Sequence, residues 1–271
     1  MDSDDALIGR LLSRREVLAL FGAGGLALVV GCSSKESQST ATTGAATSTT
    51  APASTASAST ATKLASAATT ATPSCVVRPA LTEGPYFVDE KLQRSDIRSE
   101  PSDGTLRPGA PLALTFNVSS VGTNGCVPLE GATVDVWHCD ALGVYSDATD
   151  PSFSTKGQKF LRGYQVTDGA GKAAFTTVYP GWYQGRAVHI HFKIRNAAGA
   201  GKTFDFTSQL FFDDSLTDQV HAQEPYSQKG QRTLRNNGDD IFRSGGDQLL
   251  LDVSKTSDGY AATFDVGLNM T

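Results

Sequence analysis

Short segments that alternate apolar and polar residues recur from residue 112 onward, and they constrain the fold more than any other feature of the sequence. Ala187–Arg195 is the clearest, with an apolar side chain at every second position, which is the period of a strand with one buried face. The turn residues of Asp168–Gly171 lie between two such segments, as is typical of a hairpin. The segments are Leu112–Ser119, Ala132–His138, Gly163–Thr167, Ala173–Val178, Ala187–Arg195, Phe204–Phe212, Gln248–Val253 and Tyr260–Val266.

Many short strands joined by turns predict an all-β domain with the architecture of an antiparallel β-sandwich. Convincing helical periodicity is rare in the same part of the chain. Asp213–Val220 fits either a short helix or an irregular loop.

The first 32 residues are typical of an export signal. Arg14 and Arg15 precede an apolar run over 17–30, which is shorter than the roughly 20 residues that span a bilayer. The twin arginines resemble the twin-arginine export signal, and Val29–Cys32 resembles a bacterial lipobox, in which the cysteine is lipidated. We therefore expect an exported protein, either secreted or lipid-anchored through Cys32 on the outer face of the bacterial cell membrane. The export route and the lipidation stay open.

Residues 33–74 consist almost entirely of Ser, Thr and Ala, with Leu64 as the one large apolar side chain. Such a tract cannot bury enough surface to offset its ordering entropy, so we expect a disordered linker. The folded domain then covers 75–271, which is long enough for one substantial core. It contains Cys75, Cys126 and Cys139. In an exported protein two of the three should pair, and we favour a bridge from Cys75 to one of the others.

The charge of the chain argues against nucleic acid as a partner. The formal net charge is −5, and no window contains a dense Lys/Arg cluster. Neutralising a phosphate backbone needs such a basic surface.

The alternation in Ala187–Arg195 places two histidines on one face of a strand. The apolar set is Val188, Ile190, Phe192 and Ile194, and the polar set is His189, His191, Lys193 and Arg195. The two histidines stand about 7 Å apart at Cα, close enough to bind one metal ion. A Pro-Gly turn just before the strand presents Tyr183, and Arg186 lies between this tyrosine and His189.

A pair of neutral histidines suits Zn, Cu, Fe or Ni. Residues 192–201 contain no Asp or Glu, and the next carboxylate, Asp205, lies on the following strand. The nearest oxygen donor is the phenol of Tyr183, which suits a ferric ion because a 3+ charge strongly lowers a phenol pKa. From these residues alone, a metal site and a hydrogen-bonded histidine pair on a polar face are equally supported.

The other chemistry-bearing residues give weaker signals. His138 follows three apolar residues on its face of the strand, so we expect it to end an apolar face rather than to bind metal. His221 lies in a polar stretch, and we expect it to be solvent-exposed. Tyr145, in the loop after the 132–138 strand, carries little weight alone. We expect Tyr86 and Phe87, after the Gly-Pro turn, to pack on the sandwich rather than to line a pocket.

Five motifs, in their order and spacing, resemble the intradiol ring-cleavage dioxygenases, in particular exported single-domain members related to protocatechuate 3,4-dioxygenase and catechol 1,2-dioxygenase. The motifs are TEGPY at 82–86, VDVWHCDALGVYSD at 134–147, FLRGYQVTDGAGKAAFTTVYPGWY at 160–183, GRAVHIHFKI at 185–194 and TSQLFF at 207–212. The resemblance covers most of 75–271 and implies an intradiol dioxygenase-like β-sandwich. PGWY at 180–183 replaces the PGPY of protocatechuate enzymes, so substrate preference does not carry over.

The resemblance implies a non-haem Fe(III) centre with two tyrosine and two histidine ligands. The matching positions are Tyr145, Tyr183, His189 and His191. The family's active-site arginine matches Arg186, and its substrate-side glutamine matches Gln209. Tyr183 is implied to leave the metal when substrate binds and to accept a proton, Arg186 to stabilise developing negative charge, and Gln209 to orient the ring.

The activity that the resemblance implies is the oxidation of a catechol-type substrate by O2, which opens the ring between the two hydroxyl-bearing carbons and gives a cis,cis-muconate-type diacid. The identity of the catechol and the oligomeric state stay open. One alternative is a lipid-anchored β-sandwich module that binds phenolic or polysaccharide ligands without catalysis. Another, a copper or zinc hydrolase built on His189 and His191, needs a carboxylate base that the sequence does not place.

Overall fold

The computed structural model describes residues 76–123, 125–198 and 202–269, which belong to one compact unit. The export signal (1–32), the linker (33–74) and Cys75 lie outside these residues, so the predictions made for them stay predictions. Among the helices of the described part, none has the length and apolar character needed to cross a bilayer.

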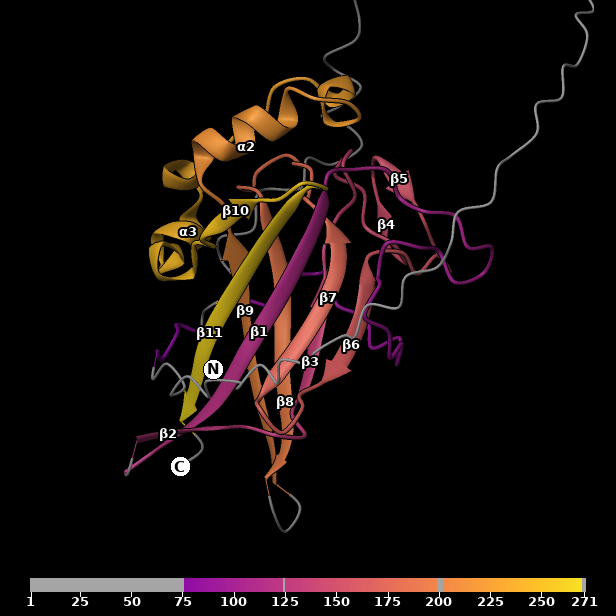
Figure 1. The fold of residues 1–271 in the computed structure, drawn as a ribbon. Coiled ribbons are helices and arrows are strands. Elements are labelled where there is room, and N and C mark those ends of the chain that lie inside the picture. The colour runs from indigo at the N-terminus through magenta and orange to yellow at the C-terminus, as the bar shows by residue number, and fades with distance from the viewer. Residues whose placement is uncertain (1–75, 124, 199–201, 270–271) are drawn as a thin grey trace, which may run out of the picture. The chain divides into compact units, whose positions relative to one another are not determined.

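Two β-sheets packed face to face form the domain (Figure 1), which confirms the predicted β-sandwich. The strands are β1 (Pro111–Gly122), β2 (Gly125–Pro128), β3 (Thr133–Trp137), β4 (Thr149–Asp150), β5 (Phe153–Ser154), β6 (Arg162–Val166), β7 (Lys172–Val178), β8 (His189–Ala198), β9 (Lys202–Phe211), β10 (Val253–Lys255) and β11 (Tyr260–Asn269). One sheet has the order β10-β11-β1-β2, with β7 also paired to β1. The other has the order β6-β3-β8-β9, and β4 pairs with β5 separately.

The helices follow one another between β9 and β10 and gather at one end of the sandwich (Figure 1). They are α2 (Asp214–His221), η1 (Tyr226–Lys229), η2 (Asn236–Gly238), α3 (Asp240–Arg243) and η3 (Gly246–Leu249). The segment that fitted either a helix or a loop is thus helical. Asp213 caps α2, since its carboxylate accepts hydrogen bonds from the backbone N–H groups of Ser215 and Leu216.

Strand pairing differs from the prediction in three places. The turn Asp168–Gly171 does not close a hairpin, because β6 pairs with β3 in one sheet and β7 pairs with β1 in the other, so the turn carries the chain between sheets. Strands β1 and β11 pair in parallel, while the other pairs of these strands in the described residues are antiparallel. The strand expected at Gln248–Val253 is mostly η3 and extended chain, and only Val253 belongs to β10.

The apolar face of β8 lies between the two sheets, as its alternation predicted. All four of its apolar residues are at most 2% exposed. The ring of Phe192 lies 5.2 Å from that of Phe116 in β1 and 5.6 Å from that of Phe264 in β11, measured between centroids. Close packing of these rings joins the sheets through the middle of β8.

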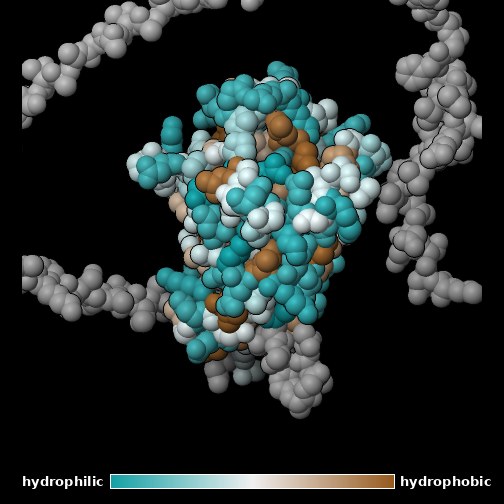
Figure 2. Space-filling model, turned by 90° about the vertical axis from the view of Figure 1, so that its right-hand side faces the viewer, coloured by the Kyte–Doolittle hydropathy of each residue, from teal (hydrophilic) through white to brown (hydrophobic). Residues whose placement is uncertain are grey.

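The large apolar side chains that remain exposed are spread over the described surface rather than gathered in one patch. Figure 2 shows one mostly hydrophilic face with separate apolar spots. The exposed residues are Val77, Val88, Leu106, Leu142, Val127, Val166 and Leu250. Single exposed apolar residues are ordinary on a folded domain.

We expect Phe192→Ala to lower the free energy of unfolding by about 3–5 kcal/mol, because it leaves a cavity between the two sheets. Denaturant unfolding measures this value. Val166→Ala is the control, since Val166 is 42% exposed and its loss should change stability by less than about 0.5 kcal/mol. Equal effects of the two substitutions would contradict the assigned core.

Candidate metal centre

The outer face of β8 carries the residues that were predicted to bind metal. His191 stands opposite Trp137 of β3 on one side and Gln209 of β9 on the other, and directly opposed residues in antiparallel strands share a face. The segment before β1 runs along this region, where the Leu81 N–H donates to the Thr207 carbonyl at 3.0 Å. The site therefore lies between the sheet and the N-terminal part of the domain.

All four predicted ligands meet at Nε2 of His189. This atom lies 3.0 Å from Nε2 of His191, 3.3 Å from the hydroxyl of Tyr183 and 3.5 Å from the hydroxyl of Tyr145. His189, His191 and Tyr145 are each at most 2% exposed, and Tyr183 is half-buried. Sequence reasoning thus named residues that the fold brings together from three separate segments.

The hydrogen bonding at His189 shows that this cluster fits a cation. Its Nδ1 lies 2.7 Å from the Ala187 carbonyl, so Nδ1 carries the proton and Nε2 presents a lone pair. Nη1 of Arg186 lies 3.4 Å from the same Nε2, together with the three donor atoms named above. One lone pair cannot serve four neighbours, whereas one metal ion would use the lone pairs of both imidazoles and both phenols.

Tyrosine is essential to any metal site here. Within the described residues, no group of three or more His, Cys, Asp or Glu side chains could hold a metal ion. Two neutral imidazoles and two phenols form a donor set that suits Fe(III), because a 3+ charge favours ionised phenols. A zinc or copper hydrolase would also need a carboxylate base, which this cluster does not supply.

His191 is oriented by packing rather than by a hydrogen bond. Its ring stacks on Trp137 with 5.0 Å between centroids and 7° between planes. A Cβ added at Gly84 would lie 3.1 Å from Cε1 of His191, so the Gly-Pro turn closes over the ring edge. Nδ1 of His191 is buried without a hydrogen-bond partner. Stacking and close backbone contact therefore hold this ligand in place.

The loops that carry the two tyrosines touch each other at glycines. Gly143 has φ +77°, and a Cβ there would overlap the carbonyl oxygen of Trp182. A Cβ at Gly181 would overlap the carbonyl of Ala141, and the Gly181 N–H donates to the Asp140 carbonyl at 3.1 Å. These contacts fix the separation between the chain segments that present Tyr145 and Tyr183.

Lys229, the last residue of η1, and Gly230 after it contact both tyrosine loops. Nζ of Lys229 donates to the Leu142 carbonyl and lies 5.0 Å from the ring centre of Trp182. The indole N–H of Trp182 donates to the Gly230 carbonyl at 3.1 Å. Because Leu142 and Trp182 belong to different tyrosine loops, Lys229 connects the two.

Tyr86 and Phe87 pack on the site as expected, but Phe87 also lines the small cavity beside Trp137, which the packing expectation did not include. The Tyr86 ring stacks on Tyr145 with 4.4 Å between centroids, and its hydroxyl donates to Asp150 at 2.9 Å. Phe87 lies against Trp137, 4.8 Å between centroids. Tyr86 thus supports the ligand candidate Tyr145. Phe87 supports Trp137, which stacks on the ligand candidate His191.

Arg186 is held on two sides by side chains from distant segments. Its Nε donates to Asp239 at 3.0 Å, and its Nη2 donates to Oε1 of Gln209 at 2.6 Å. Nε2 of Gln209 in turn donates to the Thr82 carbonyl at 2.8 Å. The structure therefore places Gln209 beside Arg186, as predicted. Sequence reasoning missed Asp239, whose signal is an aspartate after the Asn-Asn-Gly turn, a typical helix cap.

Burial controls the protonation of the four candidate ligands when no cation is bound. It raises the pKa of Tyr145 well above its ordinary value and that of Tyr183 to about 12, with Arg186 opposing the rise at Tyr183. It lowers the pKa of His189 and His191 well below the usual range, and the charge of Arg186 adds to the decrease. The imidazoles are therefore neutral, as metal ligands must be, and each phenol must lose its proton to bind a cation.

The two remaining histidines lie outside the cluster. His138 is fully buried, with Nδ1 2.7 Å from the Cys139 carbonyl and Nε2 2.6 Å from Thr177, so both ring nitrogens have protein partners, and the residue follows the buried face of β3 as expected. The prediction that His221 is exposed is wrong, because its ring stacks on Tyr226 and it is only 8% exposed.

The cysteines agree in part with the expected pairing. Cys126 is disulfide-bonded, and Cys139 is free and buried. Burial raises the pKa of the Cys139 thiol to about 12, so it stays protonated. Since Cys75 lies outside the described residues, its bridge to Cys126 stays a prediction.

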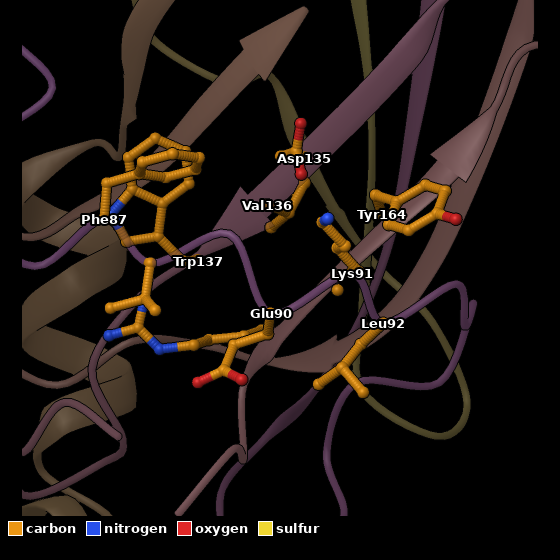
Figure 3. Close-up of a pocket in the computed structure, with 11 residues that line it drawn as sticks. Phe87, Glu90, Lys91, Leu92, Asp135, Val136, Trp137 and Tyr164 are labelled. Atoms are coloured by element: carbon orange, nitrogen blue, oxygen red, sulfur yellow. The ribbon is translucent and has the colours of Figure 1, made fainter. Parts of the chain in front are cut away.

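The cavity beside Trp137 is too small to be the substrate site. Phe87 and Trp137 lie together on one side of it, and Glu90 lies below them (Figure 3). Its volume of about 10 Å³ is near the minimum that admits one water molecule. This cavity therefore cannot accept an aromatic substrate.

The sequence and the fold match known dioxygenases. A family model described as Dioxygenase matches residues 82–268. The structure resembles an intradiol ring-cleavage dioxygenase from Tetranychus urticae, with a TM-score of 0.62 and 32% identity over 72% of this chain and 95% of that one. Chlorocatechol 1,2-dioxygenase of Pseudomonas sp. (strain P51) is 29% identical over 154 residues, 50% of this chain and 55% of the relative. Catechol 1,2-dioxygenase 2 of Acinetobacter lwoffii is 34% identical over 155 residues, 50% of this chain and 51% of the relative. The chain thus spans about half the length of these two relatives.

We expect Gly143→Ala to reduce iron binding by at least about 10-fold, because it drives apart the loops that carry Tyr145 and Tyr183. Gly157→Ala is the matched control, since Gly157 has φ +84° and nothing within 4 Å of an added Cβ. Both substitutions carry the cost of the left-handed backbone, and only the first creates an overlap. Metal analysis after iron loading separates them, and equal iron contents would refute the proposed contact.

Proposed function

Because the chain belongs to the intradiol ring-cleavage dioxygenase family, we propose that it binds non-haem Fe(III) and cleaves a catechol-type aromatic with O2. The ring opens between its two hydroxyl-bearing carbons, both oxygen atoms of O2 enter the product, and the product is a cis,cis-muconate-type diacid. Tyr145, Tyr183, His189 and His191 are the proposed ligands. The observation that carries the proposal is the convergence of their donor atoms on Nε2 of His189 within 3.5 Å.

Bound Fe(III) supplies Lewis acidity and a template for the two substrate oxygens. The protein residues divide the remaining work between fixed support and proton transfer. His189 is held through Nδ1 by the Ala187 carbonyl, His191 by the stack on Trp137, and Tyr145 by the stack on Tyr86. All three are buried, so they serve as support.

Tyr183 is the tyrosine suited to leave and to accept a proton. It is half-buried, whereas Tyr145 is 1% exposed. Burial raises the pKa of Tyr183 to about 12. It therefore favours the neutral phenol whenever the Tyr183 hydroxyl is not bound to a cation. A phenolate with such a pKa is a strong base toward a catechol hydroxyl, and Tyr183 Oη therefore takes one substrate proton.

Arg186 and Gln209 act on the substrate side. Two of the three guanidinium nitrogens of Arg186 are engaged by Asp239 and Gln209. The third, Nη1, points at the donor cluster, 3.4 Å from Nε2 of His189. A fixed N–H donor of this kind stabilises negative charge that develops on the ring and on oxygen. Gln209 orients the arginine and the edge of the ring.

A module that only binds phenolic or polysaccharide ligands is not favoured. Such a module needs neither a complete donor set nor an arginine aimed at it. All four donors and Arg186 are in place.

We further propose that the protein is exported and anchored by a lipid on Cys32, or secreted. The support is the apolar run after Arg14 and Arg15 and the sequence around Cys32. A lipid anchor is the single contact with the membrane in this proposal, and oligomerisation stays open.

We expect the purified, iron-loaded protein to be red-brown from tyrosinate-to-ferric charge transfer and to consume one O2 per catechol. An oxygen electrode combined with mass spectrometry of the product tests both statements, and labelled O2 should deliver both atoms to the diacid. A colourless iron-replete protein would refute the tyrosine ligands. A different O2 stoichiometry would refute the dioxygenase step.

We expect Tyr183→Phe and His191→Ala to reduce kcat/KM by more than about 100-fold, since each removes a ligand rather than an outer group. Tyr164→Phe is the control, because Tyr164 lies on β6, outside the donor cluster. Its kcat/KM should stay within about twofold of the unmodified protein. Comparable losses in all three variants would show that the effect is not specific to the site.

A further inference from the structure

Asp239 connects the helical segment to the candidate metal centre through a single oxygen atom. Its Oδ2 accepts the Nε–H of Arg186 at 3.0 Å and the backbone N–H of Ala187 at 2.8 Å. We infer that Asp239 is the positioning residue that holds Arg186 toward the substrate in the reaction proposed above. The inference rests on that proposed function and adds a residue to it.

The other oxygen of Asp239 anchors this carboxylate to α3. Oδ1 accepts the backbone N–H of Ile241 at 2.8 Å and that of Phe242 at 3.3 Å. Asp239 is 2% exposed, and the Phe242 ring packs on Phe211 of β9 with 5.1 Å between centroids. The carboxylate is therefore fixed to the helix cap on one side and to the sandwich behind it, and cannot follow a movement of the arginine.

Asp239 and Gln209 each accept a hydrogen bond from a different nitrogen of the Arg186 guanidinium. Asp239 takes Nε, and Gln209, itself bonded to the Thr82 carbonyl, takes Nη2. The planar guanidinium then has one orientation, in which Nη1 lies 3.4 Å from Nε2 of His189. Without the Asp239 contact, Gln209 alone holds the guanidinium through Nη2, and one hydrogen bond does not fix the direction of Nη1.

Charge gives Asp239 a second role in the same position. The Arg186 side chain is 15% exposed and forms an ion pair with Asp239. A mostly buried guanidinium beside a cation site needs a nearby negative charge. Asp239 supplies this charge at Nε, while Nη1 is the nitrogen near His189.

Asp239→Ser separates positioning from helix capping. Serine is as good an N-cap as aspartate, so it keeps the cap of α3 and removes the carboxylate from Arg186. Asp213→Ser is the matched control, because Asp213 caps α2 through the Ser215 and Leu216 N–H groups and lies outside the donor cluster. The two proteins are loaded with excess iron and compared for melting temperature, iron content, kcat and KM with catechol.

We expect Asp239→Ser to lower kcat by about 10–100-fold at unchanged iron content, while Asp213→Ser keeps the kcat of the unmodified protein. Asp239→Ser also removes the acceptor of the Ala187 N–H in either background. Its effect on kcat should therefore be much smaller in an Arg186→Gln background, where only the part that does not pass through the arginine remains. If Asp239 had only a structural role, Asp239→Ser would lower the melting temperature, and kcat calculated per bound iron would stay unchanged.

Three results of the kinetic comparison would overturn the inference. They are an unchanged kcat for Asp239→Ser, an activity loss that only follows lost iron, and full additivity with Arg186→Gln. If Asp239→Ser does not fold, the double variant with Arg186→Gln is tested instead. This variant no longer contains the Arg186 guanidinium, which Asp239→Ser would leave buried without its ion-pair partner. It should then fold and melt near Arg186→Gln, and its failure to fold would also overturn the inference. If the unmodified protein and Asp213→Ser both fail to consume O2 with catechol, the proposed function itself is wrong.

Discussion

Burial of both faces of β8 is the constraint on which the rest of the structure depends. Phe192 fills the space between the sheets, and its neighbour His191 points the opposite way into the donor cluster. Because side chains alternate along a strand, a shift of one residue in register would exchange the core face and the ligand face. Pairing with β3 and β9 on both sides excludes that shift. The geometry of the two histidines is therefore as stable as the core itself.

The two tyrosines have no strand to position them, and close contact between loop backbones replaces it. Gly143 and Gly181 let the loops approach until backbone carbonyls fill the space that a Cβ would need. Lys229 then joins both loops to the helical segment. Loops held in this way can present fixed ligands and still allow one of them to move. Tyr183 is half-buried, whereas Tyr145 lies under Tyr86, so Tyr183 is the tyrosine that we propose to move.

Periodicity predicted what depends on local pattern, and it failed where long-range pairing decides. The alternation around His189 predicted the face of each residue correctly, but not the rings of Phe116 and Phe264 that Phe192 contacts. The turn at Asp168–Gly171 has the composition of a hairpin, but composition does not say that its two strands belong to different sheets. Tyr145 and Gln209 came from resemblance to a family, since nothing local marks them. His221 and Asp239 are polar residues that distant segments bury, and a single sequence carries no signal for that contact beyond the cap motif at Asp239.

Charge balance accounts for the proton that Tyr183 is proposed to accept and for the pairing of Arg186 with Asp239. Two ionised phenols would offset two of the three charges of a ferric ion, and the imidazoles are neutral. A substrate that gives up two protons adds two negative charges, so the buried site stays near neutrality only if one phenol regains its proton. The raised pKa of Tyr183 favours that step. An unpaired arginine at the same distance would repel the cation. Paired with Asp239 at 3.0 Å, it offers a directed N–H donor and little net charge, which is the combination that a cation site can accept beside it.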